Sequence, residues 1–185
     1  MIPAPTVEYG LLSPMLIVFG VAVAGVLVEA FIPRAHRFGT QLALALGGLI
    51  AAFAAVVWVA RGLPGDGRIA AMGAVAVDRP ALLLQGTLLL IGVVGILLIA
   101  ERSPANPDSG SESATAARGL DAFTPQAAAV PGSVAEMVAT RAGIVQTEVF
   151  PLTMFGIGGM LLFPAADDLL TMFIALEVLS LPLYL

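Results

Sequence analysis

Long apolar runs separated by short polar connections extend along most of this chain. Three of these runs, at 11–31, 41–60 and 81–100, have about twenty residues each, and a helix of about twenty apolar residues crosses a hydrocarbon core about 30 Å thick. Two shorter runs follow at 149–163 and 169–185. The pattern predicts an all-α, polytopic integral membrane protein with about five transmembrane helices, the last of them incomplete.

The fourth and fifth runs differ from the first three in length. We expect the fourth to borrow a turn from Thr147 and Glu148, because its 15 residues fall short of the membrane thickness. The fifth is still apolar at Leu185, so we expect this sequence to be part of a longer chain. Pro182 is expected to kink the fifth helix and to free backbone carbonyl groups near Glu177.

A polar stretch interrupts the apolar pattern between residues 104 and 146. It is rich in Ser, Pro, Ala and Gly and contains both charge signs, a composition typical of sequence outside the bilayer. We expect a flexible linker at 104–119, and the spacing of apolar residues predicts a short amphipathic helix at 133–147. The organisation is then three transmembrane helices in 1–103, a polar cytoplasmic linker or insertion in 104–146, and two further helices in 147–185.

The distribution of arginines favours one orientation of these helices. Cytoplasmic connections contain an excess of basic residues. If the spans alternate, five arginines lie on the side reached after the first and third spans, and three lie on the other side. The distribution therefore predicts an external N-terminus. The first group is Arg34, Arg37, Arg102, Arg118 and Arg141, and the second is Arg61, Arg68 and Arg79.

Composition excludes several classes of function. Hydrophobic residues make up 59% of the chain and charged residues 11%, with a mean hydropathy of +1.00, far from the balance of a soluble domain. Without cysteine, the chain cannot form disulfides or ligate zinc or iron–sulfur clusters through thiolates, so redox cofactors would belong to partners. The single histidine, His36, has no acidic neighbours at metal-ligand spacing, and the net charge of −5 argues against nucleic acid as a partner.

Glu177 is the most informative polar residue within the apolar runs. Between Leu169 and Leu185 only the Tyr184 phenol accompanies it as an ionisable group, and nine residues separate it from Asp168. That spacing places Glu177 about 14 Å inside the membrane, near the midplane, where a carboxyl is costly and most often functional. We favour a proton-carrying or cation-coordinating role with a partner on a helix outside this sequence; the alternative is a structural carboxyl between helices.

The other polar and small residues in the spans have simpler explanations. Glu29 lies about one turn from the positive connection at Arg34, so we expect it to reach the interface and pair there. Asp167 and Asp168 precede the fifth helix, and we expect helix capping rather than metal binding. Five glycines inside apolar helices are expected to allow close helix packing rather than nucleotide binding: Gly92, Gly95, Gly156, Gly158 and Gly159.

The end of the sequence resembles a known family. Residues 147–185, TEVFPLTMFGIGGMLLFPAADDLLTMFIALEVLSLPLYL, are similar to the fourth and fifth helices of subunit N of respiratory complex I, the proton-translocating NADH-quinone oxidoreductase. The Glu-x-x-Ser-Leu-Pro order within ALEVLSLPLY, 175–184, is similar to subunit N rather than to the sister subunits L and M. AVDRPALLLQG at 76–86 looks like the family's entry to its third helix, whereas 105–143 departs from the family pattern.

The resemblance implies a fold and a role. The family has an antiporter-like bundle of fourteen helices, in which a fifth-helix glutamate, matched here by Glu177, pairs with a lysine on a later helix in a proton channel. It implies a non-redox subunit of the translocase in the plasma membrane of a bacterium, bound to other complex I membrane subunits and the lipid bilayer. FMN, iron–sulfur clusters and quinone would belong to partner subunits, with no cofactor in this chain.

Two alternatives stay open at this stage. One is a subunit of a multisubunit sodium/proton antiporter, which shares the fold and the glutamate but is expected to resemble subunits L and M after it. The order Ser180, Leu181, Pro182 argues against this alternative. The other is a non-conducting membrane scaffold in which Glu177 only holds helices together.

Overall fold

The computed structural model describes residues 7–64, 67–100 and 147–184 of the chain. By backbone contacts the chain divides into two compact units, one formed by residues 1–96 with 148–185 and the other by 97–147. The packing of the helix bundle described below is that of the first unit. The predicted linker and most of the predicted amphipathic helix at 133–147 lie outside the described residues.

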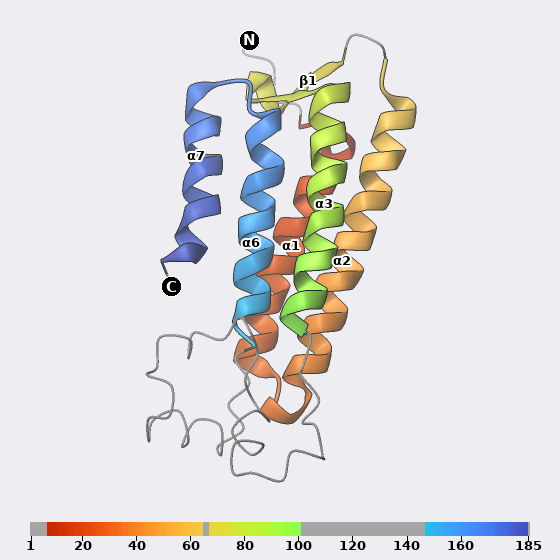
Figure 1. Cartoon of the computed structure of the whole chain (residues 1–185). Coiled ribbons are helices and arrows are strands. Elements are labelled where there is room, and N and C mark those ends of the chain that lie inside the picture. Colours follow the sequence, from red (N-terminus) through yellow and green to blue (C-terminus); the bar gives the residue numbers. More distant parts are fainter. Residues whose placement is uncertain (1–6, 65–66, 101–146, 185) are drawn as a thin grey trace. The chain divides into compact units, whose positions relative to one another are not determined.

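Five α-helices account for the apolar runs. They are α1 (Tyr9–Phe31), α2 (Arg34–Gly62), α3 (Arg79–Ala100), α6 (Val149–Leu162) and α7 (Leu169–Ser180), and successive helices run in opposite directions (Figure 1). By length and composition the first three can cross a membrane, while α6 and α7 are shorter apolar helices. The prediction of an all-α membrane helix bundle is confirmed.

Two helix boundaries differ from the sequence prediction. The second helix begins at Arg34 rather than at residue 41, because a helix can extend into polar sequence beyond the hydrocarbon core, and hydropathy marks only the part inside it. The fifth helix ends at Ser180 instead of continuing to the last residue, and a 3₁₀ turn, η5 (Leu181–Leu183), follows it. Pro182 has no N–H to continue the α-helical ladder, and the α-helix changes to the 3₁₀ turn just before it. The kink predicted at Pro182 stays a prediction.

Helix α6 lies at the centre of this unit, in contact with α1, α2 and α7. Its inner residues Phe150, Ile157 and Leu161 are almost completely buried. Close packing depends on glycine, as the sequence predicted: a methyl group on Gly158 would lie 2.6 Å from the ring of Phe19 on α1. Further buried side chains of the core include Val18, Leu49, Leu89 and Met154.

The glycine prediction is confirmed at some positions and stays a prediction at Gly95. A methyl group on Gly92 would lie 3.0 Å from Ile157 Cδ1, so α3 approaches α6 closely at this level. No described atom lies within 4 Å of the corresponding position on Gly95, which faces open space. Glycine spacing alone does not identify the packed face, because the partner helix decides which glycine is covered.

A β-hairpin that the sequence did not predict joins α2 to α3. Strand β1 (Arg68–Ala70) pairs antiparallel with β2 (Val75–Val77), with Ile69 opposite Ala76. The tight 3₁₀ turn between them, η1 (Ala71–Gly73), places two non-glycine residues, Ala71 and Met72, at φ values of 51° and 58°. Strands of three residues are too short to give the alternating apolar pattern from which a strand is predicted.

The hairpin is attached to the connection between α6 and α7. That connection contains a further 3₁₀ turn, η4 (Phe163–Ala165). Val75 forms an isolated antiparallel bridge with Ala166, and the Asp167 N–H donates to the Ala74 carbonyl at 3.0 Å. These contacts hold the start of α7 against the segment that precedes α3, and they fix the position from which α7 begins.

Candidate functional site

The helix that contains Glu177 is started by a side-chain cap. Asp168 Oδ1 accepts from the Thr171 N–H at 2.6 Å, and its Oδ2 accepts from the Thr171 hydroxyl at 3.1 Å. The predicted capping is therefore confirmed for Asp168. Asp167 does not cap the helix through its side chain; its backbone N–H binds the hairpin instead. The side-chain cap from Asp168 to Thr171 and the backbone bond of Asp167 to the hairpin thus define where α7 begins.

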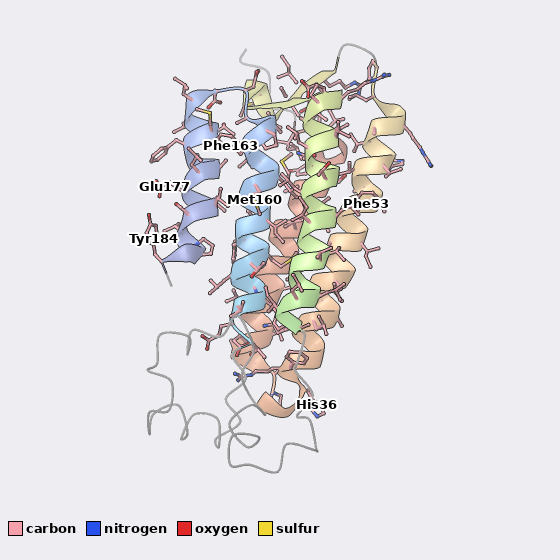
Figure 2. The ribbon with its side chains drawn as sticks, viewed as in Figure 1. His36, Phe53, Met160, Phe163, Glu177 and Tyr184 are labelled. Carbon is pink, nitrogen blue, oxygen red and sulfur yellow. The ribbon has the colours of Figure 1, made fainter. Side chains whose placement is uncertain are left out.

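One face of α7 is fixed by close contact with α6. A methyl group on Gly159 would lie 2.6 Å from Leu179 N and 2.9 Å from the Ala175 carbonyl oxygen. Ala175 is completely buried at this contact. At 100° per residue, Glu177 is rotated about 160° from both Ala175 and Leu179. Glu177 therefore projects from the side of α7 opposite α6, as Figure 2 shows.

The face of α7 around Glu177 is an uncovered apolar surface. Glu177 itself is exposed. Leu170, Phe173, Ile174 and Leu181 fall on the same side of the helix, and their exposed fractions range from 47% to 69%. Apolar side chains can face lipid, but a carboxyl at that depth is costly. This combination is typical of a helix face that is covered by another protein helix.

The Glu177 side chain has no hydrogen bond or ion pair within the described part of the chain. Its backbone carbonyl accepts from the Leu181 N–H and, at 3.2 Å, from the Ser180 hydroxyl. The carbonyl group that Pro182 leaves without an α-helical donor is that of Val178, four residues earlier, so the prediction of freed carbonyl groups near Glu177 stays a prediction. The predicted partner on a helix outside this sequence, and the role of Glu177, stay predictions.

A second polar cluster connects α1 and α2 at the opposite end of the bundle from the hairpin. Arg37 Nη1 donates to Glu29 Oε1 at 2.9 Å, and Arg37 Nε donates to the Ile32 carbonyl at 2.6 Å. Both charged side chains are about one-fifth exposed. The predicted pairing of Glu29 with the positive connection is confirmed, with Arg37 as its partner. This cluster holds the turn between α1 and α2 closed, so its charged residues are explained by a role in the fold.

Two buried glutamines were missed by the sequence analysis. Gln41, 1% exposed, donates to the Gly25 carbonyl at 2.8 Å and to Glu29 Oε2 at 3.2 Å. Gln85, 2% exposed, donates to the Leu161 carbonyl at 3.0 Å and connects α3 to α6. The sequence could have identified both, because an amide side chain inside an apolar span is expected to form a hydrogen bond to a neighbouring helix.

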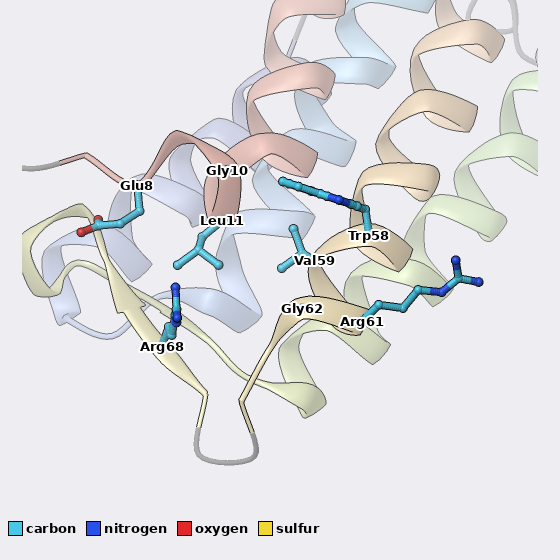
Figure 3. Close-up of a pocket in the computed structure, with 8 residues that line it drawn as sticks. All are labelled: Glu8, Gly10, Leu11, Trp58, Val59, Arg61, Gly62 and Arg68. Carbon is cyan, nitrogen blue, oxygen red and sulfur yellow. The ribbon is translucent and has the colours of Figure 1, made fainter.

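A cavity of about 570 Å³ lies between the start of α1, the end of α2 and β1 (Figure 3). The Trp58 ring closes one side of it over Gly10. None of its lining residues comes from α6 or α7, so this cavity is not part of the Glu177 site. It is lined by Glu8, Gly10, Leu11, Trp58, Val59, Arg61, Gly62 and Arg68.

Comparison with known proteins identifies relatives over the whole chain, although no protein-family model matches it. The chain is 60% identical to NADH-quinone oxidoreductase subunit N of Mycobacterium tuberculosis (strain ATCC 25618 / H37Rv) and 64% identical to that of Rhodococcus opacus (strain B4). It is 56% identical to the subunit N of Acidothermus cellulolyticus. All of the chain is covered in each case, and it spans about a third, 32–35%, of the length of these relatives.

Proposed function

Since this chain belongs to the family of NADH-quinone oxidoreductase subunit N and corresponds to its N-terminal part, we propose that the protein is a membrane-arm subunit of that complex. In this role it couples NADH oxidation and quinone reduction to proton translocation. The identity of 64% to a subunit N along the whole chain supports the assignment, and so does the apolar multi-helix fold.

The position of Glu177 is the observation that supports a proton-carrying role for this residue. Its carboxyl is the one acidic group on α7, and it lies on the uncovered face of the helix. We assign it the role of holding and releasing a proton. A cationic side chain on the covering helix, a lysine by the family resemblance, would stabilise the carboxylate. When that cation moves away, the charge in a low-dielectric site becomes costly, and the carboxylate takes up a proton.

The remaining chemistry is assigned to partner subunits. The proposed complex contains FMN, iron–sulfur clusters and a quinone site in other subunits, and this chain acts without a cofactor of its own. Its own contribution is to place Glu177 in the membrane at a fixed height. The Asp168 cap and the contact of Gly159 with α7 set that height and the direction of the carboxyl. We place the complex in the bacterial plasma membrane.

The two alternatives have less support. A sodium/proton antiporter subunit would share the helix bundle, but the relatives described above are all named subunit N. A non-conducting scaffold, in which Glu177 only holds helices together, predicts that Glu177→Ala disrupts assembly whereas Glu177→Gln has no effect on proton movement. Purification of the native protein from mild-detergent membranes is expected to retain flavin and iron–sulfur subunits; recovery with antiporter subunits alone would favour the first alternative.

The role of Glu177 is tested in the intact complex by replacing it with glutamine. We expect Glu177→Gln to lower the number of protons moved per NADH oxidised in sealed membrane vesicles, because an amide cannot release a proton. Glu148→Gln is the matched control, since it makes the same change at an exposed glutamate that precedes α6. An unchanged ratio in a fully assembled Glu177→Gln complex would show that this carboxyl does not carry protons.

A further inference from the structure

A groove of about 510 Å³ runs along the outer side of the bundle between α2 and α3. One face of each helix forms its walls. Phe53 and Val57 contribute from α2, and Leu83, Gly86 and Leu90 contribute from α3. Both helices are long and apolar enough to span a membrane. The lining residues of α3 extend over about 16 Å of helix, close to the depth of one leaflet of the hydrocarbon core.

The floor and walls of this groove are apolar. A methyl group on Gly86 would lie 3.7 Å from the Phe53 ring. Because glycine has no side chain, the groove is deeper beside Gly86 than it would be beside a larger residue. The hydroxyl of Thr87, the polar group along the walls, donates to the Leu83 carbonyl of its own helix at 2.9 Å. Leu83 and Leu90 are 72% and 55% exposed. An extended hydrocarbon chain would therefore meet only apolar atoms.

Two arginines stand at one end of the groove. Arg61 is in the last turn of α2 and Arg79 is the first residue of α3. Both are exposed, and neither has a hydrogen bond or ion pair to another described residue. Figure 3 shows the Arg61 guanidinium directed away from Leu11 and Val59. The neighbouring Trp58 is 66% exposed, as is typical of a tryptophan at the membrane interface.

We infer that this groove binds one anionic glycerophospholipid, with its phosphate on Arg61 and Arg79 and an acyl chain along α2 and α3. Charge selects this occupant. Among the described residues, the groove has two positive charges without an ion pair at its interfacial end and no acidic residue in its lining, so a headgroup with net negative charge is favoured. A zwitterionic headgroup would add a cation beside the two guanidinium groups. A protein helix would need its own acidic groups at this level.

The inference does not depend on the role of Glu177. It is tested with the native protein in its own assembly, reconstituted in phosphatidylcholine vesicles that contain a small fraction of phosphatidylglycerol with a photoreactive acyl chain. After illumination, mass spectrometry locates the labelled residues. We expect labels on the groove walls, at Phe53, Val57, Leu83 or Leu90, and we expect unlabelled phosphatidylglycerol, but not phosphatidylcholine, to compete for this labelling.

Arginine variants distinguish a headgroup site from general lipid contact. An arginine near an anionic headgroup contributes a free energy equal to about a fivefold change in affinity, so Arg61→Gln with Arg79→Gln should lower groove labelling at least fivefold. Arg68→Gln is the matched control, because this exposed arginine in β1 lies outside the groove. Gly86→Leu should reduce labelling by filling the floor while leaving both arginines in place.

Three results would overturn the inference. One is labelling spread evenly around α2 and α3 and unchanged in the double arginine variant, which would mean ordinary bilayer contact. Another is the presence of a protein helix in the groove in the assembled protein, revealed when a photoreactive amino acid at Leu83 forms protein crosslinks instead of lipid adducts. The third is labelling that phosphatidylcholine displaces equally well, which would exclude selection by charge.

Discussion

Replacing Gly159 by alanine is expected to push α7 away from α6. The added methyl group would lie 2.6 Å from Leu179 N and 2.9 Å from both Leu179 Cα and the Ala175 oxygen. These are backbone atoms, so no side chain can rotate to make room. A retreat of about 0.8 Å is needed to restore the 3.4 Å of an ordinary contact. Overpacking of this kind typically costs about 1–3 kcal/mol.

Two assays measure this effect in the assembled protein. The thermal unfolding midpoint should fall, because the overpacked contact destabilises the folded state. The number of protons moved per NADH oxidised should fall as well, because Glu177 is part of α7 and shifts with it when α7 moves away from α6.

Gly156→Ala is the matched control for this prediction. It makes the same replacement one turn earlier in α6, where the new methyl group would lie 4.0 Å from the Leu179 oxygen. Alanine favours a helix over glycine by up to about 1 kcal/mol at either position, so the difference between the two variants isolates the contact. If Gly159→Ala behaved like Gly156→Ala in both assays, α7 would not pack on α6 in the way described.

Three further variants test the elements that support the site, each followed by thermal unfolding of the assembled protein. Asp168→Ala should cost about 0.5–2 kcal/mol by removing the cap of α7, while Asp167→Ala, which keeps its backbone N–H to the hairpin, should change little. Gln85→Leu should cost about 0.5–1.5 kcal/mol by removing the hydrogen bond between α3 and α6; a neutral result would mean that this bond does not stabilise the bundle. Glu29→Ala should cost about 1–3 kcal/mol because Arg37 and Gln41 lose a charged acceptor, and Glu29→Gln should cost less.

Hydropathy predicted the helices well because it measures the property that the membrane selects. It located α1, α3 and α6 to within about two residues. It failed at the start of α2, where polar residues continue the helix, and at the end of α7, where the α-helix changes to a 3₁₀ turn just before Pro182. Helix ends depend on backbone hydrogen bonds, and the mean hydropathy of a segment carries no information about those bonds.

The site could be predicted in part. The sequence identified Glu177 as an isolated carboxyl in an apolar helix, and the structure adds the direction in which it projects. That direction depends on the contact of Gly159 with Ala175 and Leu179, a tertiary contact with no local signal. The attachment of the hairpin to the start of α7 was missed for the same reason, since the bridge joins Val75 to Ala166, ninety-one positions apart in the sequence.

The carboxyl of Glu177 has a consequence for how α7 is inserted into the membrane during synthesis. Each Leu, Ile, Phe or Val of a helix favours insertion by only about 0.3–0.6 kcal/mol, whereas one charged side chain near a helix centre opposes insertion by about 2.5–3.5 kcal/mol. The single carboxylate of α7 therefore offsets several of its apolar residues, so α7 gains from not entering the lipid alone. It would enter the bilayer as a helical hairpin with α6, whose glycine-lined face is the surface that α7 needs. The site would then form only when α6 and α7 are inserted together. A substitution that weakens the α6–α7 contact would lower the amount of inserted protein as well as its activity.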